Sequence, residues 1–236
     1  MKPIIIANWK MNLTLKEAIL KAEQLEKRNY SSQLLLAPPA LYLGHLASIL
    51  KKTALCAQDV SLASGQGAYT GENSSDMIKS CSINHALIGH SERRTVFKES
   101  NSIVKTKVAN CLNSGVMPII CIGENLETRQ NNNYKEFLVQ QLTESIPDNA
   151  HNIIIGYEPV WAIGSGIIPT PEEIAEVFEL IKTDKNISMV AKNAQLVYGG
   201  SVNSKNYKEI LAVPGNSGLI LGSASLKEDE LNTILN

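Results

Sequence analysis

Short apolar segments alternate along the whole chain with longer stretches in which hydrophobic residues recur every three or four positions. The short segments are continuously apolar and rich in β-branched residues, which is typical of strands that are covered on both faces. The longer stretches have the period of amphipathic helices. Eight strands are predicted, at residues 4–7, 34–37, 54–57, 86–88, 118–122, 153–156, 195–198 and 218–221.

Two of the longer stretches also carry chemical signals for the start of a helix. Thr14 and Glu17 have the spacing of a capping box, in which each side chain binds the backbone N–H of the other residue. Thr170 precedes a proline, which suits the first helical position, and Glu173 completes a second box. The apolar stripes expected behind these starts are Leu15, Ala18, Ile19, Ala22 and Leu25 in the first helix, and Ile174, Val177, Phe178 and Ile181 in the second.

The order of the elements predicts an α/β fold with a parallel sheet. Seven helix-length connections join the eight segments, and a helical crossover makes consecutive strands parallel. A further amphipathic segment at 226–235 completes eight strand–helix units, which over about 250 residues is the size of a single (β/α)8 barrel with outer helices. Residues 1–236 contain no linker or composition shift, so one domain is expected. Because alternation alone does not show closure, an open doubly wound sheet is the alternative.

Composition and charge restrict the partners that this chain can have. Of its 236 residues 44% are apolar, which excludes a disordered chain, and 22 basic against 23 acidic residues give a net charge of −1. Neither nucleic acid nor an anionic membrane surface is therefore expected as a partner. No apolar run approaches the roughly 20 residues that span a bilayer, and the first segment becomes polar at Asn8, too early for a signal peptide. The four cysteines lie far apart without a CxxC pair, which indicates free thiols and a cytoplasmic protein.

Polar residues from distant parts of the sequence follow the carboxyl ends of the predicted strands. In a parallel sheet all these ends emerge on one face, and in a barrel that face carries the active site. The first polar residues after six of the strands are Asn8 with Lys10, His90, Glu124, Glu158, Ser201, and Gly222 with Ser223. One face is therefore predicted to collect a lysine, a histidine, a glutamate and two small glycine–serine turns.

Each of these side chains also has an ordinary structural explanation. A lysine after a strand is usually a solvated charge, although the neighbours Trp9 and Met11 predict that Lys10 is partly buried. A single histidine such as His90 is more often a helix cap or a core residue than a catalyst. Glu158 is harder to explain in this way, because an ionisable group ending an apolar strand is costly without a partner or a function. Their convergence on one face favours a catalytic site.

Glycine-rich turns after the last two predicted strands favour a phosphate site. The glycines at 199–200 and at 222 let backbone N–H groups approach an anion, and phosphate sites in such barrels commonly follow strands seven and eight. One such turn would be an ordinary tight turn, but two at these strands favour a phosphate monoester. A GxGxxG pattern starting at residue 164 is broken by Pro169, and the four histidines lack metal-ligand spacing, so neither a cofactor nor a metal is expected.

A base, a hydrogen-bond donor and an ammonium group suit the removal of a proton next to a carbonyl. Glu158 would take the proton, while Lys10 and His90 would stabilise the oxygens of the developing enediolate. Such electrostatic stabilisation needs water to be excluded. The loop 159–170 is glycine-rich in its middle and bounded by prolines, so it has the length and hinges of a lid, the alternative being a long surface loop.

Several segments together resemble the triosephosphate isomerase family. They are residues 8–10, 88–94, 121–124, 157–164 and 198–201, and they match in order between Ile6 and Leu226. The resemblance implies a TIM barrel that interconverts dihydroxyacetone phosphate and D-glyceraldehyde 3-phosphate, a step of glycolysis and gluconeogenesis. It implies Glu158 as catalytic base, His90 as electrophile, and Asn8 and Lys10 as substrate-binding electrostatic groups. A neutral His90 is carried over from the family, which is a standard example of a glutamate base beside a neutral histidine.

The resemblance also assigns binding and supporting residues. Glu92 would pair with Lys10, and Ser91 and Glu124 would support the catalytic groups. The phosphate would be held by backbone N–H groups of Gly164, Ser201, Gly222 and Ser223.

A homodimer is implied by the same resemblance. The loop at about 64–75 is similar to a segment that inserts into a neighbouring subunit. Thr70 would reach Asn8 and Lys10 of the partner subunit, and Tyr69 and Arg93 would be further subunit contacts. Without the family, this loop would be only a glycine-rich surface excursion.

Two positions depart from the usual sequence of the family. The lid tip reads Ile167-Ile168-Pro169, where the family often has Lys-Thr-Ala, and Ser223 stands where a second glycine is usual. A serine with negative φ still offers its backbone N–H, so phosphate binding is expected to persist.

Two other functions fit a phosphate-binding barrel. A barrel aldolase needs a Schiff-base lysine deep in the barrel, and Lys10 on the first strand, opposite a glutamate on the sixth, argues against it. A phosphate-ligand-binding or other phosphosugar barrel protein without this turnover would not need a base such as Glu158.

Overall fold

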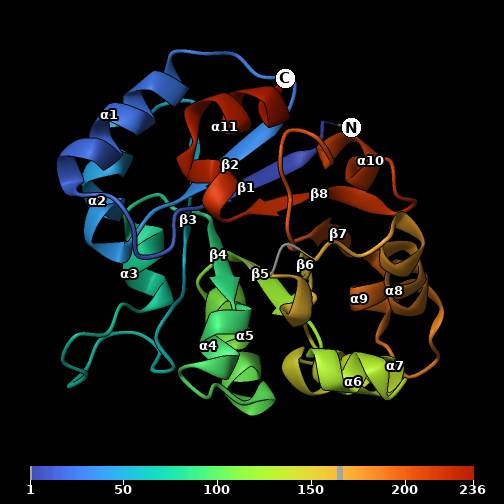
Figure 1. Cartoon of the computed structure of the whole chain (residues 1–236). Helices are drawn as coiled ribbons and strands as arrows, with labels where there is room; N and C mark the ends of the chain where they lie inside the picture. Colours follow the sequence, from blue (N-terminus) through green and yellow to red (C-terminus); the bar gives the residue numbers. More distant parts are fainter. Residues whose placement is uncertain (1, 164–166) are drawn as a thin grey trace.

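The structure is a computed structural model that describes residues 2–163 and 167–236. Within these residues eight strands form a closed barrel in chain order, with the helices around its outside (Figure 1). The strands are β1 (Ile4–Asn8), β2 (Gln33–Ala37), β3 (Ala54–Ala57), β4 (His85–Ile88), β5 (Met117–Ile122), β6 (Ile154–Tyr157), β7 (Gln195–Tyr198) and β8 (Asn216–Leu221).

The first strand closes the barrel by pairing on both of its edges. In β1, Ile4 lies opposite Gln33 of β2 on one side and opposite Gly218 of β8 on the other. All eight neighbouring pairs are parallel. The predicted barrel is therefore confirmed, and the open sheet alternative is wrong. Each predicted strand lies within two residues of the observed bounds.

Helices connect the strands on the outer surface, as the crossovers predicted (Figure 1). The connection between β3 and β4 differs, because residues 58–74 form turns and bends and only the short α3 is helical. The helices are α1 (Leu15–Glu26), α2 (Ala40–Ile49), α3 (Ser75–Ser80), α4 (Ser91–Thr95), α5 (Asn101–Asn113), α6 (Leu126–Gln130), α7 (Tyr134–Ser145), η1 (Val160–Ala162), α8 (Pro171–Thr183), α9 (Met189–Asn193), α10 (Tyr207–Leu211), η2 (Ser223–Leu226) and α11 (Glu228–Leu235).

Both predicted helix starts are present. The backbone N–H of Thr14 donates to Glu17 Oε2 at 2.7 Å, and that of Thr170 donates to Glu173 Oε2 at 2.9 Å, completing a capping box in each case. The predicted stripe of α8 is fully buried. In α1 the stripe is shorter than expected, since Leu15 in the first turn is 44% exposed while the later members pack against the barrel.

The core has two layers that alternate along each strand. In β1, Ile4 and Ile6 point into the barrel with residues from the other strands, whereas Ile5 and Ala7 point outward into the layer shared with the helices. Both faces of the strands are therefore covered, which explains their continuously apolar sequences. Among the described residues, no helix is both long enough and apolar enough to cross a membrane.

A buried cluster of charges joins the loop after β3 to α5. Lys107 Nζ lies 2.6 Å from both Asp59 Oδ2 and Glu99 Oε1, and Arg93 Nε lies 2.8 and 2.6 Å from the same two oxygens. The side chains of Lys107 and Glu99 are almost completely buried. Burial raises the pKa of Asp59 to about 6, although Lys107 acts in the opposite direction. Two carboxylates therefore depend on two cations in this cluster.

We expect Lys107→Met to destabilise the fold by about 3 kcal/mol, because it leaves two buried carboxylates with one cation fewer. Urea unfolding of the two proteins measures this difference. The control is Lys135→Met, which removes an ion pair with Glu176 whose side chains are 51% and 43% exposed. That change should cost no more than about 1 kcal/mol. Equal losses in the two variants would contradict a special role for the buried cluster.

Candidate active site

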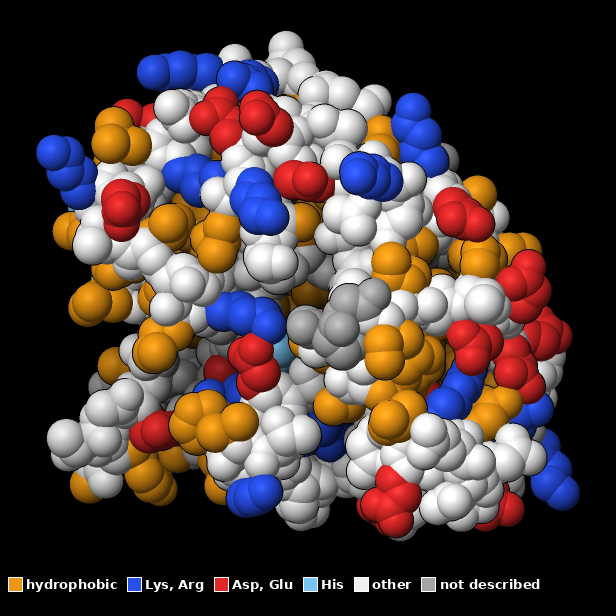
Figure 2. Space-filling model, in the orientation of Figure 1, with side chains coloured by type: hydrophobic (Ala, Val, Ile, Leu, Met, Phe, Trp, Pro, Cys, Tyr) orange, Lys and Arg blue, Asp and Glu red, His pale blue; other side chains and the backbone are white. Residues whose placement is uncertain are grey.

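A cavity of about 430 Å³ opens at the carboxyl ends of the strands. Asn8, Lys10, His90 and Glu158 all line it, together with the turns after β7 and β8. Figure 2 shows a histidine inside this hollow, next to basic and acidic side chains. The prediction that these distant residues share one cavity is therefore confirmed.

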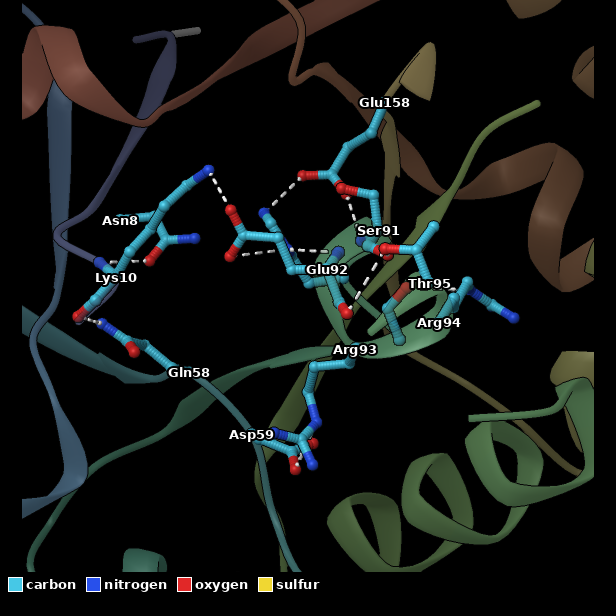
Figure 3. Close-up of polar contacts among 12 residues, drawn as sticks. Asn8, Lys10, Gln58, Asp59, Ser91, Glu92, Arg93, Arg94, Thr95 and Glu158 are labelled. Carbon is cyan, nitrogen blue, oxygen red and sulfur yellow. Dashed lines mark hydrogen bonds and ion pairs between the residues drawn. The ribbon is translucent and has the colours of Figure 1, made fainter. Parts of the chain in front are cut away.

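Lys10 follows β1 in a strained backbone conformation. Its φ is +52°, and its N–H donates to Asn8 Oδ1 at 3.0 Å. Lys10 Nζ binds Glu92 Oε1 at 2.5 Å, so the expected pair is present (Figure 3). The lysine side chain is 27% exposed, which agrees with the partial burial predicted from its neighbours. The ammonium group is thus held at the cavity while still reachable by an anion.

His90 is the residue that caps α4, and its two ring nitrogens have different partners. Nδ1 accepts the backbone N–H of Glu92 at 3.2 Å, while Nε2 lies 3.1 Å from Glu158 Oε1. An Nδ1 that accepts this bond carries no proton, so these partners assign the ring proton to Nε2. Burial lowers the pKa of His90, but the facing carboxylate raises it by more, so its pKa lies above the ordinary value.

Glu158 ends β6 and is 1% exposed. Its Oε2 accepts the backbone N–H of Ser91 at 2.9 Å (Figure 3), and Oε1 lies 3.1 Å from His90 Nε2. Burial raises the pKa of Glu158, but His90, the Ser91 N–H and Lys10 together outweigh it and hold the pKa below its usual value. Gly199 permits this position, because a Cβ there would lie 2.8 Å from Glu158 Cγ. The carboxylate is therefore ionised at neutral pH, which is the form of a base.

The small residues after β7 and β8 form another part of the cavity wall. Ser201, Gly222 and Ser223 line it, and η2 begins at Ser223. A Cβ added to Gly222 would lie 3.3 Å from Lys10 Cε, so this turn is next to the lysine. Gly164, the remaining residue predicted to bind phosphate, lies outside the described residues.

Glu124 lies behind the cavity rather than in its lining. It is fully buried, and its Oε1 accepts the hydroxyl of Tyr157 at 3.1 Å and the indole N–H of Trp161 at 2.9 Å. Its backbone carbonyl also accepts the N–H of Val160 at 3.0 Å. Glu124 therefore fixes the residues on either side of Glu158, a supporting position.

Some residues of the site were missed in the sequence. Gln58 Nε2 donates to the carbonyls of Lys10 at 2.9 Å and Ala37 at 2.8 Å. Gln58 is the first residue after β3, so the same strand-end reasoning, applied to the third strand, would have found it. Six residues that line the cavity carry no motif, namely Asn12, Val202, Asn203, Ile220, Ala224 and Leu226, whereas Ile163 belongs to the segment 157–164 that resembles the family.

The residues predicted to contact a second subunit lie in two places. Tyr69 and Thr70 are exposed in the long loop after β3, which extends away from the barrel (Figure 1). Arg93 binds Asp59 and Glu99 of its own chain, and its contact with a second subunit stays a prediction. In the described part of the chain, no group of three or more histidine, cysteine, aspartate or glutamate side chains is arranged to hold a metal ion.

Known proteins resemble this chain along almost its whole length. The sequence profile of triosephosphate isomerase matches residues 3–236. Triosephosphate isomerase of Orientia tsutsugamushi (strain Ikeda) is 39% identical, over all of this chain and 97% of the relative, and that of Francisella philomiragia is 36% identical with the same coverage. The crystal structure of triosephosphate isomerase from Bartonella henselae superposes with a TM-score of 0.86 at 37% identity, covering 99% of this chain and 98% of the other. The chain therefore belongs to the triosephosphate isomerase family, whose members are isomerases.

Proposed function

We propose that this chain interconverts dihydroxyacetone phosphate and D-glyceraldehyde 3-phosphate through an enediolate. The observation that carries the proposal is the single cavity lined by Asn8, Lys10, His90 and Glu158. Family membership supports the same reaction, and it does not favour a phosphate-binding barrel without turnover.

The substrate phosphate binds at the turns after β7 and β8. Ser201, Gly222 and Ser223 line that end of the cavity, and Lys10 lies beside Gly222. Backbone N–H groups and an ammonium group together stabilise a dianion. The reacting carbons then lie between this turn and Glu158. Gly164 stays a prediction for the same phosphate.

Glu158 removes the proton from the carbon next to the carbonyl. Both of its oxygens have partners, Ser91 N–H and His90 Nε2, so proton transfer requires the carboxylate to exchange at least one of these bonds for the substrate C–H. General base catalysis of this kind contributes roughly 10²–10⁴-fold to the rate.

His90 and Lys10 stabilise the negative charge that develops on the substrate oxygens. With its proton on Nε2, His90 donates toward the cavity, while Glu92 N–H holds its other nitrogen. Lys10 supplies a positive charge, and its position is fixed by Glu92 and Asn8. Preorganised donors cost little reorganisation during the reaction, and removing one typically costs roughly 10²–10³-fold in kcat.

The loop 159–170 serves as a lid over this cavity, within one domain formed by residues 1–236. Among its described residues, Ile163 lines the cavity, and η1 directly follows Glu158 in the chain. Ile167 and Ile168 are 49% and 43% exposed and so offer apolar surface at the lid tip. Excluding water strengthens the charge interactions in the site.

Two chains assemble into a homodimer through the loop 64–75. Large apolar side chains are exposed on the loops after β1, β3 and β4, all at the carboxyl end of the barrel, and such surface favours an interface. They are Met11 at 95%, Tyr69 at 58%, Val96 at 67% and Phe97 at 64% exposure. Thr70, next to Tyr69, then reaches Asn8 and Lys10 of the partner subunit.

The enzyme works in the cytoplasm, in glycolysis and gluconeogenesis. All four cysteines are unpaired, which supports a reducing compartment. The pathway follows from the reaction of the family.

A coupled assay with dihydroxyacetone phosphate tests the reaction, with 2-phosphoglycolate as an inhibitor that mimics the enediolate. We expect Glu158→Gln to lose roughly 10²–10⁴-fold in kcat because the base is gone. Its circular dichroism should match that of the unchanged protein. Glu172→Gln, on the surface of α8, is the control and should retain full activity. Full turnover by Glu158→Gln would place the base elsewhere.

Lys10→Met should lower kcat/KM by roughly 10²-fold or more, since the cavity loses the cation that meets the substrate's negative charge. The variant should also bind 2-phosphoglycolate more weakly, and calorimetry measures this affinity. Lys16→Met, an exposed lysine on α1, is the matched control. An unchanged kcat/KM for Lys10→Met would show that this lysine contributes to neither substrate binding nor turnover.

Thr70→Arg should split the dimer and lower activity together, because a bulky charge cannot enter the neighbouring subunit. Light scattering gives the molecular mass, and the coupled assay gives kcat. Thr233→Arg places the same charge on the exposed side of α11 and should change neither. A fully active monomer would contradict a role for the partner subunit in the site.

A further inference from the structure

Arg94 is a charged residue that connects four elements behind the proposed base. It lies in α4, and its Nε donates to the carbonyl of Gly89 at 2.8 Å, just after β4 (Figure 3 shows its place beside Ser91 and Thr95). Its Nη2 donates to the carbonyl of Cys121 in β5 at 3.1 Å. Its Nη1 donates to Asn101 Oδ1 at 2.7 Å, at the start of α5. Its Nη2 also donates to Ser145 Oγ at 3.3 Å, at the end of α7.

All of these acceptors are neutral, so the guanidinium charge is not directly compensated. In the part of the chain that the structure describes, no carboxylate forms an ion pair with Arg94. The nearest link to one is indirect, through Asn101, whose Nδ2 donates to Glu144 at 2.8 Å. Burial lowers the pKa of Arg94, and Cys121 and Glu158 offset only part of this effect. A partly buried charge without an ion-pair partner is costly and calls for a function.

Arg94 and Glu158 line the same small cavity. It has a volume of about 210 Å³ and is also lined by Ser91, Ile122 and Phe137, and Glu158 lines both this cavity and the substrate cavity. Apolar walls reduce screening between charges. The guanidinium is therefore placed to act on the carboxylate through a medium that screens less than water.

Gly89 transmits the position of Arg94 to His90. Its φ is +66°, and a Cβ there would lie 2.8 Å from Val104 Cγ2 and 3.0 Å from Arg94 Nη2. The peptide before His90 is thus packed against the guanidinium and bonded to it. A shift of Arg94 would therefore shift the peptide between Gly89 and His90, and with it the backbone that carries the His90 ring.

We propose that Arg94 is a positioning residue of the isomerase site, which holds the Gly89 carbonyl to orient His90 and places a positive charge without an ion-pair partner on the small cavity that Glu158 also lines. This inference rests on the proposed function, since it assigns to Arg94 an action on the proposed base. The titratable groups around Glu158 are His90 after β4, Lys10 after β1, Cys121 in β5 and Arg94 in α4. The turn after β7 and the strand β8 present Gly199 and Ile220, which do not titrate.

Two substitutions separate the charge from the hydrogen bonds. Arg94→Met removes both, so kcat should fall about tenfold while KM changes little. A fall in kcat of this size is expected when one buried hydrogen bond is lost and the donor at His90 is displaced. The pKa of Glu158 should rise without the cation, so the acid limb of kcat/KM should move upward by roughly half to one pH unit. Arg94→Lys keeps the charge but not the fork of donors, so kcat should fall while the acid limb stays in place.

The pH profile is measured for all variants under the same conditions. The substrate phosphate also titrates at about pH 6, but it affects the pH dependence of kcat/KM equally in every variant. Lys107→Met is the matched control, because it removes a buried cation of the α5 cluster. It should lower stability and leave the acid limb unchanged.

An acid limb in folded Arg94→Met that coincides with that of the unchanged protein would overturn the inference. If Arg94→Met does not fold, Arg94→Lys decides instead, and full kcat in that variant would overturn the positioning role. Glu158→Gln is run in parallel. If that variant keeps full turnover, the proposed function fails, whereas loss of turnover there with no effect at Arg94 rejects only the inference.

Discussion

A buried, ionised carboxylate at the end of β6 is the constraint on which the rest of this site depends. Moving a carboxylate out of water is unfavourable unless donors and opposite charge replace the water. For Glu158 these replacements are the Ser91 N–H, His90 and Lys10, which come from the ends of β4 and β1. Only a closed barrel brings those strand ends around β6. The fold therefore determines the chemical state of the base as well as its position.

Much of this arrangement could be predicted from the sequence, because it depends on the common direction of the strands rather than on the detailed packing of side chains. Continuously apolar segments predicted the strands, since each strand is covered by the barrel interior and by helices. Parallel strands place the residues that follow them on one face, whatever their separation in sequence. This is why the sequence alone groups Lys10, His90 and Glu158. The capping boxes at Thr14 and Thr170 were equally local and were confirmed.

The parts that could not be predicted depend on side-chain direction across elements. In the sequence, Lys107 is one polar residue on an amphipathic helix. Its neighbours in the sequence do not indicate that it binds Asp59, 48 residues away, as well as Glu99. Arg94 looks like part of a charged surface run, yet its guanidinium reaches Cys121 and Ser145. Leu15 belongs to an apolar stripe by spacing but lies beyond the edge of the packed layer. The subunit contacts of Tyr69 and Thr70 require a second chain and stay a prediction.

The left-handed backbone of Lys10 also has a consequence for how this protein can change. Its φ of +52° disfavours most residues with a Cβ by about 1 kcal/mol or more, whereas glycine adopts it freely and asparagine tolerates it. At this position the stability of the fold therefore favours a residue that tolerates positive φ, whereas activity requires the lysine. Selection for thermal tolerance alone would reward glycine or asparagine, and the lysine would survive only under selection for turnover.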